Sequence, residues 1–155
     1  MTSPEGSTVT FRRVATEIRP RALLHFARKL QREVSKGRPF DCLITGDAEL
    51  RRLNREFRGR DEATDVLSFL ARPLPNGRGS LNGLGDLAIS LARARTQARE
   101  FGHTTELEVR VLMLHGVLHL LDMDHESDRG QMARAEKRWR VRLGLPDGLI
   151  ERVRS

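Results

Sequence analysis

The sequence predicts a single α/β domain with a mixed sheet of about four strands and helices packed on it. The chain has 155 residues, which suits one domain with a substantial core. Short apolar runs typical of strands alternate with longer segments whose apolar residues recur at helical spacing. The order of these segments gives two strand–helix–strand crossovers and one hairpin, so both parallel and antiparallel pairing are expected.

The first half of the chain predicts a tail, two strands and two helices. Proline fits the first turn of a helix, so Pro20 is expected to begin the first one. Asp47 is expected to cap the second, because its side chain can accept a hydrogen bond from a free N–H group at a helix start. The predicted segments are a flexible tail (1–8), a strand (9–14), a helix from Pro20 to Gly37, a strand (40–45), and a helix from Asp47 to Arg58 with Leu50, Leu53 and Phe57 as its buried stripe.

The second half predicts a hairpin followed by three helices. Residues 73–83 are rich in proline, glycine and asparagine and join two strand-like runs, which suggests an antiparallel pair. A loop of this length is often mobile and can cover a cleft. Ser90 is expected to cap the next helix and Gly102 to end it. The predicted segments are strands 65–70 and 85–90, helices 91–100 and 106–121, and a final helix that carries Met132, Ala135 and Trp139 and ends at Gly144.

The composition indicates a cytoplasmic protein with an anionic partner. A net charge of +7 and a pI of about 11.0 favour a partner such as RNA. Because 25 of the 28 basic residues are arginines, a bias that a GC-rich genome alone can produce, the charge permits RNA binding without proving it. No apolar run reaches the roughly 18 residues of a membrane span, and the first residues do not form a signal peptide. The single cysteine, Cys42, is expected to be buried and inert.

Three of the five histidines lie within residues 115–125. His115 and His119 are four residues apart and therefore share one face of a helix. His125 would lie roughly 9 Å further along the same helix, whereas zinc binds nitrogen at about 2.0–2.1 Å. We therefore expect the helix to end near Asp122 and the chain to fold back. Three imidazoles would then hold one zinc ion and leave one tetrahedral position open, as catalytic zinc sites do.

Other interpretations of this motif stay open. A histidine pair at this spacing is often structural, and Gly116 suits the close approach of a ligand or an ordinary packing contact. A zinc peptidase is disfavoured, because its His-Glu-x-x-His motif has glutamate where this chain has Gly116. His25 and His103 are expected to be bystanders. The residues that could orient a ligating imidazole through a hydrogen bond are Asp124, Glu126 and Asp128.

The pattern His-Gly-x-Leu-His-Leu followed by Asp-His resembles the signature of the YbeY family, which comprises bacterial single-strand endoribonucleases and ribosomal-RNA maturation factors. Residues 54–59, 64–69 and 84–90 resemble further blocks of the family in the same order, and the resemblance runs from Phe40 to the C-terminus. Two positions depart from the family pattern. The family usually has glycine at Asp122 and proline at Leu70, which affects local geometry but removes no ligand.

The resemblance implies a zinc-dependent, single-strand-specific endoribonuclease that matures the 3′ end of 16S ribosomal RNA and acts in ribosome quality control in the cytoplasm. Its partners would be single-stranded ribosomal RNA and the small ribosomal subunit with its proteins. It implies one Zn²⁺ per chain, held by His115, His119 and His125, and catalytic roles for His115 and for Arg58 at the edge of the metal cleft. The alternative is a non-catalytic ribosome-assembly factor in which zinc only stabilises the fold.

Overall fold

The computed structural model describes residues 6–71, 83–125 and 129–146. Its elements alternate strands and helices in the first half of the chain and end in three consecutive helices, as the sequence predicts. The elements are β1 (Thr8–Phe11), α1 (Pro20–Glu33), β2 (Phe40–Thr45), α2 (Asp47–Arg58), β3 (Val66–Leu70), β4 (Gly85–Ser90), α3 (Leu91–Phe101), α4 (Thr105–His125) and α5 (Arg129–Leu143).

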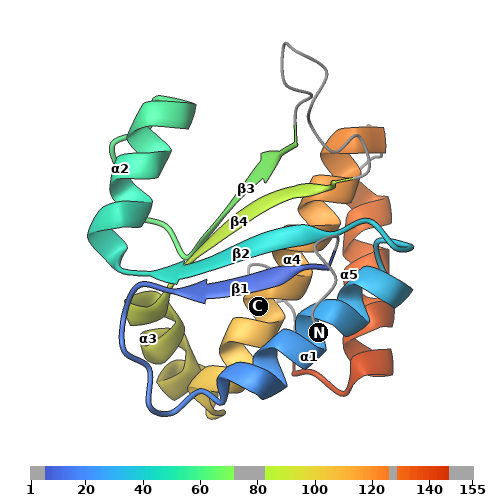
Figure 1. The fold of residues 1–155 in the computed structure, drawn as a ribbon, viewed down its shortest axis with the longest axis horizontal. Coiled ribbons are helices and arrows are strands. Elements are labelled where there is room, and N and C mark those ends of the chain that lie inside the picture. The colour runs from blue at the N-terminus through green and yellow to red at the C-terminus, as the bar shows by residue number, and fades with distance from the viewer. Residues whose placement is uncertain (1–5, 72–82, 126–128, 147–155) are drawn as a thin grey trace.

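The four strands form one mixed sheet in the order β1-β2-β4-β3 (Figure 1). β1, β2 and β4 run parallel, whereas β3 pairs antiparallel with β4 at the edge of the sheet. The predicted α/β domain with a mixed sheet is therefore confirmed. The hairpin partner β3 lies at the edge of the sheet beside β4, where α2 and α4 can both reach it.

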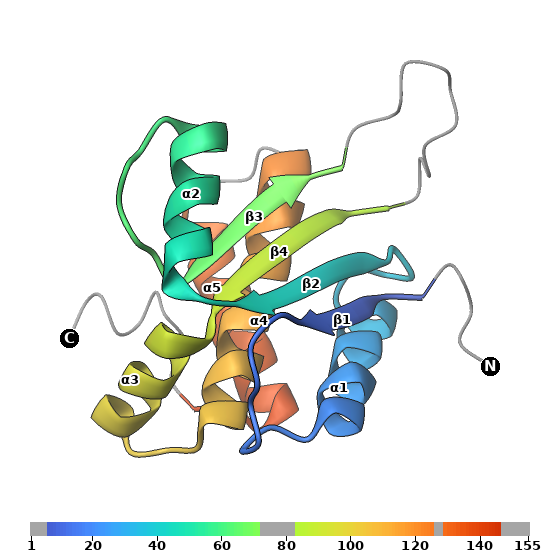
Figure 2. The ribbon, with the colours of Figure 1, turned by 60° about the vertical axis from the view of Figure 1, so that its left-hand side comes forward.

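The two faces of the sheet are covered unequally (Figure 2). One face packs on α1, α3, α4 and α5 around a large core that includes Phe40, Cys42 and Ile44 of β2. Among the described residues, the other face meets α2 alone, through a small cluster around Leu50, Leu67 and Ala88. Beside α2, the side chains on that second face line a groove.

Helix α4 passes through the middle of the larger core. Its residues from Val109 to Leu120 are mostly buried, including Leu112 and Met113, which are fully covered. Gly116 explains how close the helix lies to the sheet, since a Cβ atom there would lie 2.7 Å from Leu87 Cδ2. The Ser68 hydroxyl donates to the Gly116 carbonyl at 3.1 Å and joins β3 to α4. Of the two explanations for this glycine, the structure supports packing.

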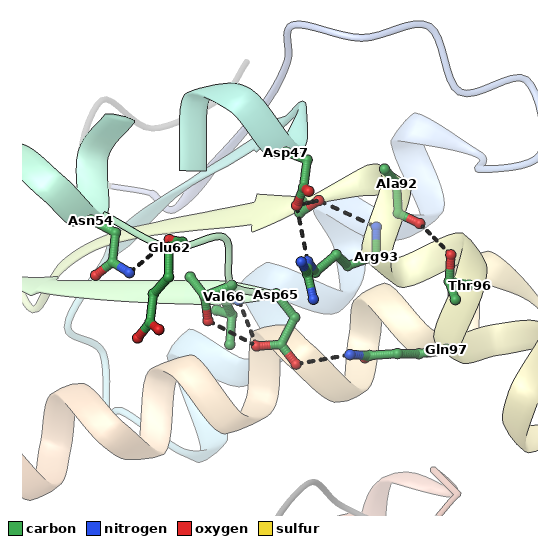
Figure 3. A network of polar contacts seen from close by, with 11 residues as sticks. Asp47, Asn54, Glu62, Asp65, Val66, Ala92, Arg93, Thr96 and Gln97 are labelled. Atoms are coloured by element: carbon green, nitrogen blue, oxygen red, sulfur yellow. Dashed lines mark hydrogen bonds and ion pairs between the residues drawn. The ribbon is translucent and has the colours of Figure 1, made fainter. Parts of the chain in front are cut away.

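Three local expectations need correction. The expected tail is too long, because Ser7 is fully buried and donates to Gln31, and β1 already begins at Thr8. The N-cap of α2 is Gly46, and the Asp47 side chain makes no cap; it accepts from Ser90 and from Arg93 at the start of α3 (Figure 3). This link reflects the position of both helix starts at the same end of adjacent strands.

The third correction concerns α2. Leu50 of the expected buried stripe is fully buried, but Phe57 is 65% exposed. The helix rises away from the sheet towards its C-terminal end (Figure 2), and Phe57 meets the sheet there through the ring of Phe69 on β3. None of the helices in the described residues is long and apolar enough to cross a membrane. The loop expected at 73–83 lies outside the described residues apart from Gly83.

Candidate metal centre and cleft

Two histidines lie one turn apart on α4 and reach the surface, although most of the helix around them is buried. His115 and His119 are partly exposed, whereas Leu114 and Leu118 next to them are buried. Their rings face the same side, with centroids 6.3 Å apart and planes inclined by 29°. The structure therefore presents two imidazoles of the predicted ligand set side by side, on a helix held in place by the core.

A buried carboxylate orients the first of these rings. Nδ1 of His115 lies 2.8 Å from Oε2 of Glu136, which comes from α5 and is only 2% exposed. An ionised carboxylate can only accept a hydrogen bond, so Nδ1–H donates and the lone pair of a neutral ring lies on Nε2. This is the arrangement in which metal-binding histidines are usually held.

Glu136 is not among the residues that the sequence predicts to orient an imidazole. The predicted residues Glu126 and Asp128 lie outside the described residues, as does the side chain of Asp124. A signal was present, because Glu136 lies four residues after Met132 and three before Trp139 and so interrupts the apolar face of the last helix. A carboxylate buried on such a face needs a polar partner.

The surroundings of His119 favour its neutral form. Its pKa is lowered mainly by burial, and further by the nearby His115 and by the positive charge of Arg58. A neutral imidazole has the free lone pair that a metal requires. The effect of Arg58 also shows that the guanidinium group at the end of α2 is close to this histidine on α4.

Arg58 differs from the other arginines of α2. Arg51 and Arg52 pair on the surface with Asp61 and Glu56, at 2.8 Å and 3.0 Å. Arg58 instead donates to the Ser68 carbonyl of β3, and its guanidinium carbon lies 5.8 Å from the ring centroid of Phe69. Of the arginines of α2, Arg58 is the one whose positive charge acts on His119.

The expected chain reversal near Asp122 is wrong, because α4 continues to His125. Residues 121–125 contain neither glycine nor proline, so the local sequence gives no strong signal to end the helix. On this backbone, position 125 lies about 9 Å beyond His119 and on another side of the helix. The side chain of His125 lies outside the described residues, within which no group of three potential metal ligands occurs.

A groove of about 1170 Å³ connects the open face of the sheet with the end of α4. Its walls include Phe57 and Arg58 of α2, Phe69 of β3, Asp86 of β4, and Met123, one turn beyond His119. The pKa of Asp86 is raised by burial and by the neighbouring Asp41, its register partner on β2. The groove is therefore acidic towards the middle of the sheet and basic at Arg58.

The other reactive groups have structural surroundings. His103 lies in the loop before α4, as expected, and its Nε2 is 2.6 Å from the fully buried Glu108. Cys42 is buried in the core, and burial raises the pKa of its thiol far above the ordinary range, so the thiol is inert as expected.

The chain is similar to known proteins over most of its length. A family model described as Endoribonuclease YbeY matches residues 8–144. A protein of that name from Solibacter usitatus is 68% identical over 155 residues, the whole of both chains. One from Nautilia profundicola is 44% identical over 112 residues, covering 72% of this chain and 77% of the relative. The solution structure of TM1509 from Thermotoga maritima matches with a TM-score of 0.54 and 24% identity over 85% of each chain, a likeness of fold alone.

Proposed function

Because this chain belongs to the YbeY family and is an endoribonuclease, we propose that its active site is the cleft between α2, β3 and α4, and that it uses zinc to cut single-stranded RNA. The enzyme is a hydrolase that acts on internal phosphodiester bonds. In the cell, the proposed role is maturation of the 3′ end of 16S ribosomal RNA and ribosome quality control. The proposed partner is the small ribosomal subunit with its proteins, in the cytoplasm.

One observation carries the location of this site. The buried Glu136 holds Nδ1 of His115 at 2.8 Å, beside a second imidazole whose pKa is lowered by burial. A carboxylate in this position fixes the ring so that Nε2 is the free donor atom. The pairing supports a metal ligand more than a structural histidine, because the second imidazole lies beside it at 6.3 Å.

The donor set suits zinc, which binds neutral imidazole nitrogens. His115 and His119 would hold one ion per chain, with His125 as the third ligand. For His125 to reach the other two, the last turn of α4, after Leu121, must open from the helical path that the structure describes. Metal binding coupled to such a local rearrangement is common, since the binding energy can offset the broken helical turn.

The chain's own residues suit phosphodiester cleavage. When bound, zinc supplies a Lewis acid for a phosphoryl oxygen and can bring the pKa of water to about 7. Arg58 approaches the same place from α2 and keeps N–H groups beyond the one that binds Ser68. These groups can hold a nonbridging phosphate oxygen and offset the negative charge that develops during cleavage. Ser68 fixes this arginine through its carbonyl and α4 through its hydroxyl.

The central test combines metal analysis with an RNA cleavage assay. We expect the purified protein to hold one zinc ion per chain and to cut single-stranded RNA faster than the same RNA in a duplex. A chelator should abolish cleavage, and added zinc should restore it. Circular dichroism and thermal unfolding should show that the chelated protein stays folded. A chelated protein that unfolds, and a metal-loaded protein that does not cut RNA, would instead favour zinc as a purely structural ion.

The cellular role needs a separate measurement. Depletion of the protein should lead to accumulation of 16S precursors with unprocessed 3′ ends, which primer-directed end mapping detects. A variant that lacks Arg58 should fail to restore the mature end, whereas a variant of the surface residue Arg52 should restore it. Normal 3′ ends in depleted cells would contradict the proposed role but would leave the endoribonuclease activity intact.

A further inference from the structure

An exposed aromatic ring lies next to the proposed phosphate-binding arginine. Phe57 occupies the last turn of α2 and is 65% exposed, although it continues the apolar stripe that begins with the buried Leu50. Leaving a phenylalanine side chain in water forgoes much of the stabilisation that its burial would give. Packing among the described residues therefore leaves most of this ring uncovered.

Phe57 is held in a defined orientation. Its ring meets that of Phe69 edge to face, with centroids 5.5 Å apart and planes at 68°. The guanidinium group of Arg58 lies over the Phe69 ring, and all three side chains line the groove that leads to the end of α4. Phe69 supports Phe57 from one side, so a flat face of the exposed ring can receive another planar group.

The charges of the groove set the direction of a bound strand. Arg58 lines the groove with its positive charge, whereas the carboxyl groups of Asp86, the cross-strand partner of Phe69, and of Asp41 line its sheet side. A phosphate group is attracted to Arg58 and repelled by ionised carboxylates. A nucleotide whose phosphate lies at Arg58 would therefore place its base near the two phenylalanines.

We propose that Phe57, supported by Phe69, is a stacking site for one unpaired nucleobase next to the phosphate that Arg58 holds. The inference rests on the proposed location of the active site. Aromatic rings bind bases of single strands in this way without reading their sequence, because every base has a flat face. A base in a duplex is already stacked and paired, so the site also gives the enzyme a physical reason to prefer single strands.

The test measures single-turnover cleavage of a short single-stranded RNA at increasing protein concentration. We expect Phe57→Ala to raise the half-saturating concentration roughly 5-fold to 100-fold and to leave the maximal rate nearly unchanged. Phe57→Trp should retain wild-type affinity. The matched control is Phe101→Ala, which changes an aromatic residue that is 43% exposed on α3 and does not line the groove. This control should cut RNA like the wild type.

A second set of substrates identifies the base that stacks on Phe57. Each RNA of the set lacks one base next to the cleaved bond. At one of these abasic positions, the wild type should lose as much affinity as Phe57→Ala loses for the intact RNA. The same abasic RNA should cause no further loss in Phe57→Ala, because the two changes remove the same contact. Equal losses in both proteins, or a Phe57→Ala variant that matches the wild type, would overturn the proposal.

Binding without cleavage separates this proposal from the proposed function. The Kd of the 2′-deoxy analogue of the same strand, measured by fluorescence anisotropy, should show the same dependence on Phe57. A protein that binds this strand through Phe57 but cuts no RNA would retain the stacking site and contradict the proposed function. A protein that cuts RNA with no dependence on Phe57 would do the reverse.

Discussion

Helix α4 is flanked by two histidine–glutamate pairs whose surroundings differ: one lies just before its first residue, here called the first end, and the other lies in the half that leads to its last residue, here called the second end. Near the start of the helix, His103 meets Glu108 at 2.6 Å, and Thr104 caps the first turn by accepting from the Leu107 amide. Further along, His115 meets Glu136 at 2.8 Å. The glutamates are 0% and 2% exposed, so neither burial nor distance distinguishes the two pairs.

What distinguishes them is the neighbourhood of the ring. The His103 side chain is 9% exposed, and its partner lies five residues along the chain. The side chain of His115 is 19% exposed, its partner comes from another helix, and a second imidazole and Arg58 lie nearby. A histidine–carboxylate pair therefore indicates a metal site only when further donors and a cleft accompany it. Changes at the first end should affect stability, and changes at the second should affect chemistry.

The largest expected effect is on cleavage and lies at the second end. His115→Ala should lower the rate of RNA cleavage on the order of a thousandfold, because it would remove a ligand of the proposed zinc ion, and such an ion supplies several kcal/mol of transition-state stabilisation. His103→Ala, at the first end, should keep a rate close to that of the wild type. Single-turnover assays on the two purified proteins make the comparison, with far-UV circular dichroism as the folding control.

The contrast between the two ends would fail if both variants lost cleavage equally while they stayed folded. It would also fail if His115→Ala cut RNA normally. In that case the His115–Glu136 pair would be structural, like the pair at the start of the helix.

The next effect concerns metal affinity. Glu136→Gln keeps the shape of the side chain but removes the charge that fixes the His115 ring, so it should weaken zinc binding about 10-fold to 100-fold. Competition with a chromogenic chelator measures this affinity directly, without RNA. Glu108→Gln is the matched control and should leave zinc affinity unchanged. Equal zinc affinities in the wild type and Glu136→Gln would contradict a role for this carboxylate in orienting a ligand.

The stability effect should be largest at the first end. His103→Ala removes a hydrogen-bond partner of the buried Glu108 and should lower the free energy of unfolding by about 1–3 kcal/mol. Denaturant titration of the metal-free wild type and variant gives this difference. A replacement of the exposed Arg99, in the last turn of α3, should change it by less than about 0.5 kcal/mol.

Much of the fold could be predicted from local sequence. Pro20, the apolar run at Phe40–Thr45, and Ser90 as the cap of α3 each act within a few residues, so their expected elements match the observed ones. Asp47 did not act as a cap, because its side chain is drawn to Ser90 and Arg93 across the sheet. That contact depends on tertiary structure, which spacing along the chain does not reveal.

The site likewise has features that local sequence predicts and features that depend on tertiary structure. The four-residue spacing of His115 and His119 follows from helix geometry, and the sequence placed them on one face. Spacing along the chain does not pair Glu136 with His115. The two residues are 21 positions apart in sequence and meet only because α5 packs against α4. The predicted end of α4 near Asp122 is wrong. It follows from the geometry that a metal ion would require, whereas the residues at that point continue the helix to His125. The ligand role of His125 stays a prediction.

The smallest expected effect is a dependence of stability on pH at the first end of α4. Glu106, in the first turn, accepts hydrogen bonds from Arg19 and Arg110 at 2.8 Å and 3.0 Å. The bond from Arg19 is the main reason that the pKa of Glu106 falls from 4.5 to about 2. The folded state therefore favours the ionised carboxylate, and this stabilisation is complete above the unfolded pKa of 4.5 and is lost as the pH falls towards 2.

The Arg19 side chain is 76% exposed, so solvent screens the pair and the contribution should be about 1 kcal/mol. Denaturant titrations of the wild type and Glu106→Gln between about pH 6 and pH 3 should show stabilities that differ at pH 6 and converge on acidification. Added salt should reduce the difference at pH 6, as expected for an exposed ion pair. RNA cleavage at neutral pH should be the same in both proteins. A difference that grew on acidification, or a loss of cleavage in Glu106→Gln, would break the division of α4 into a structural end and a chemical one.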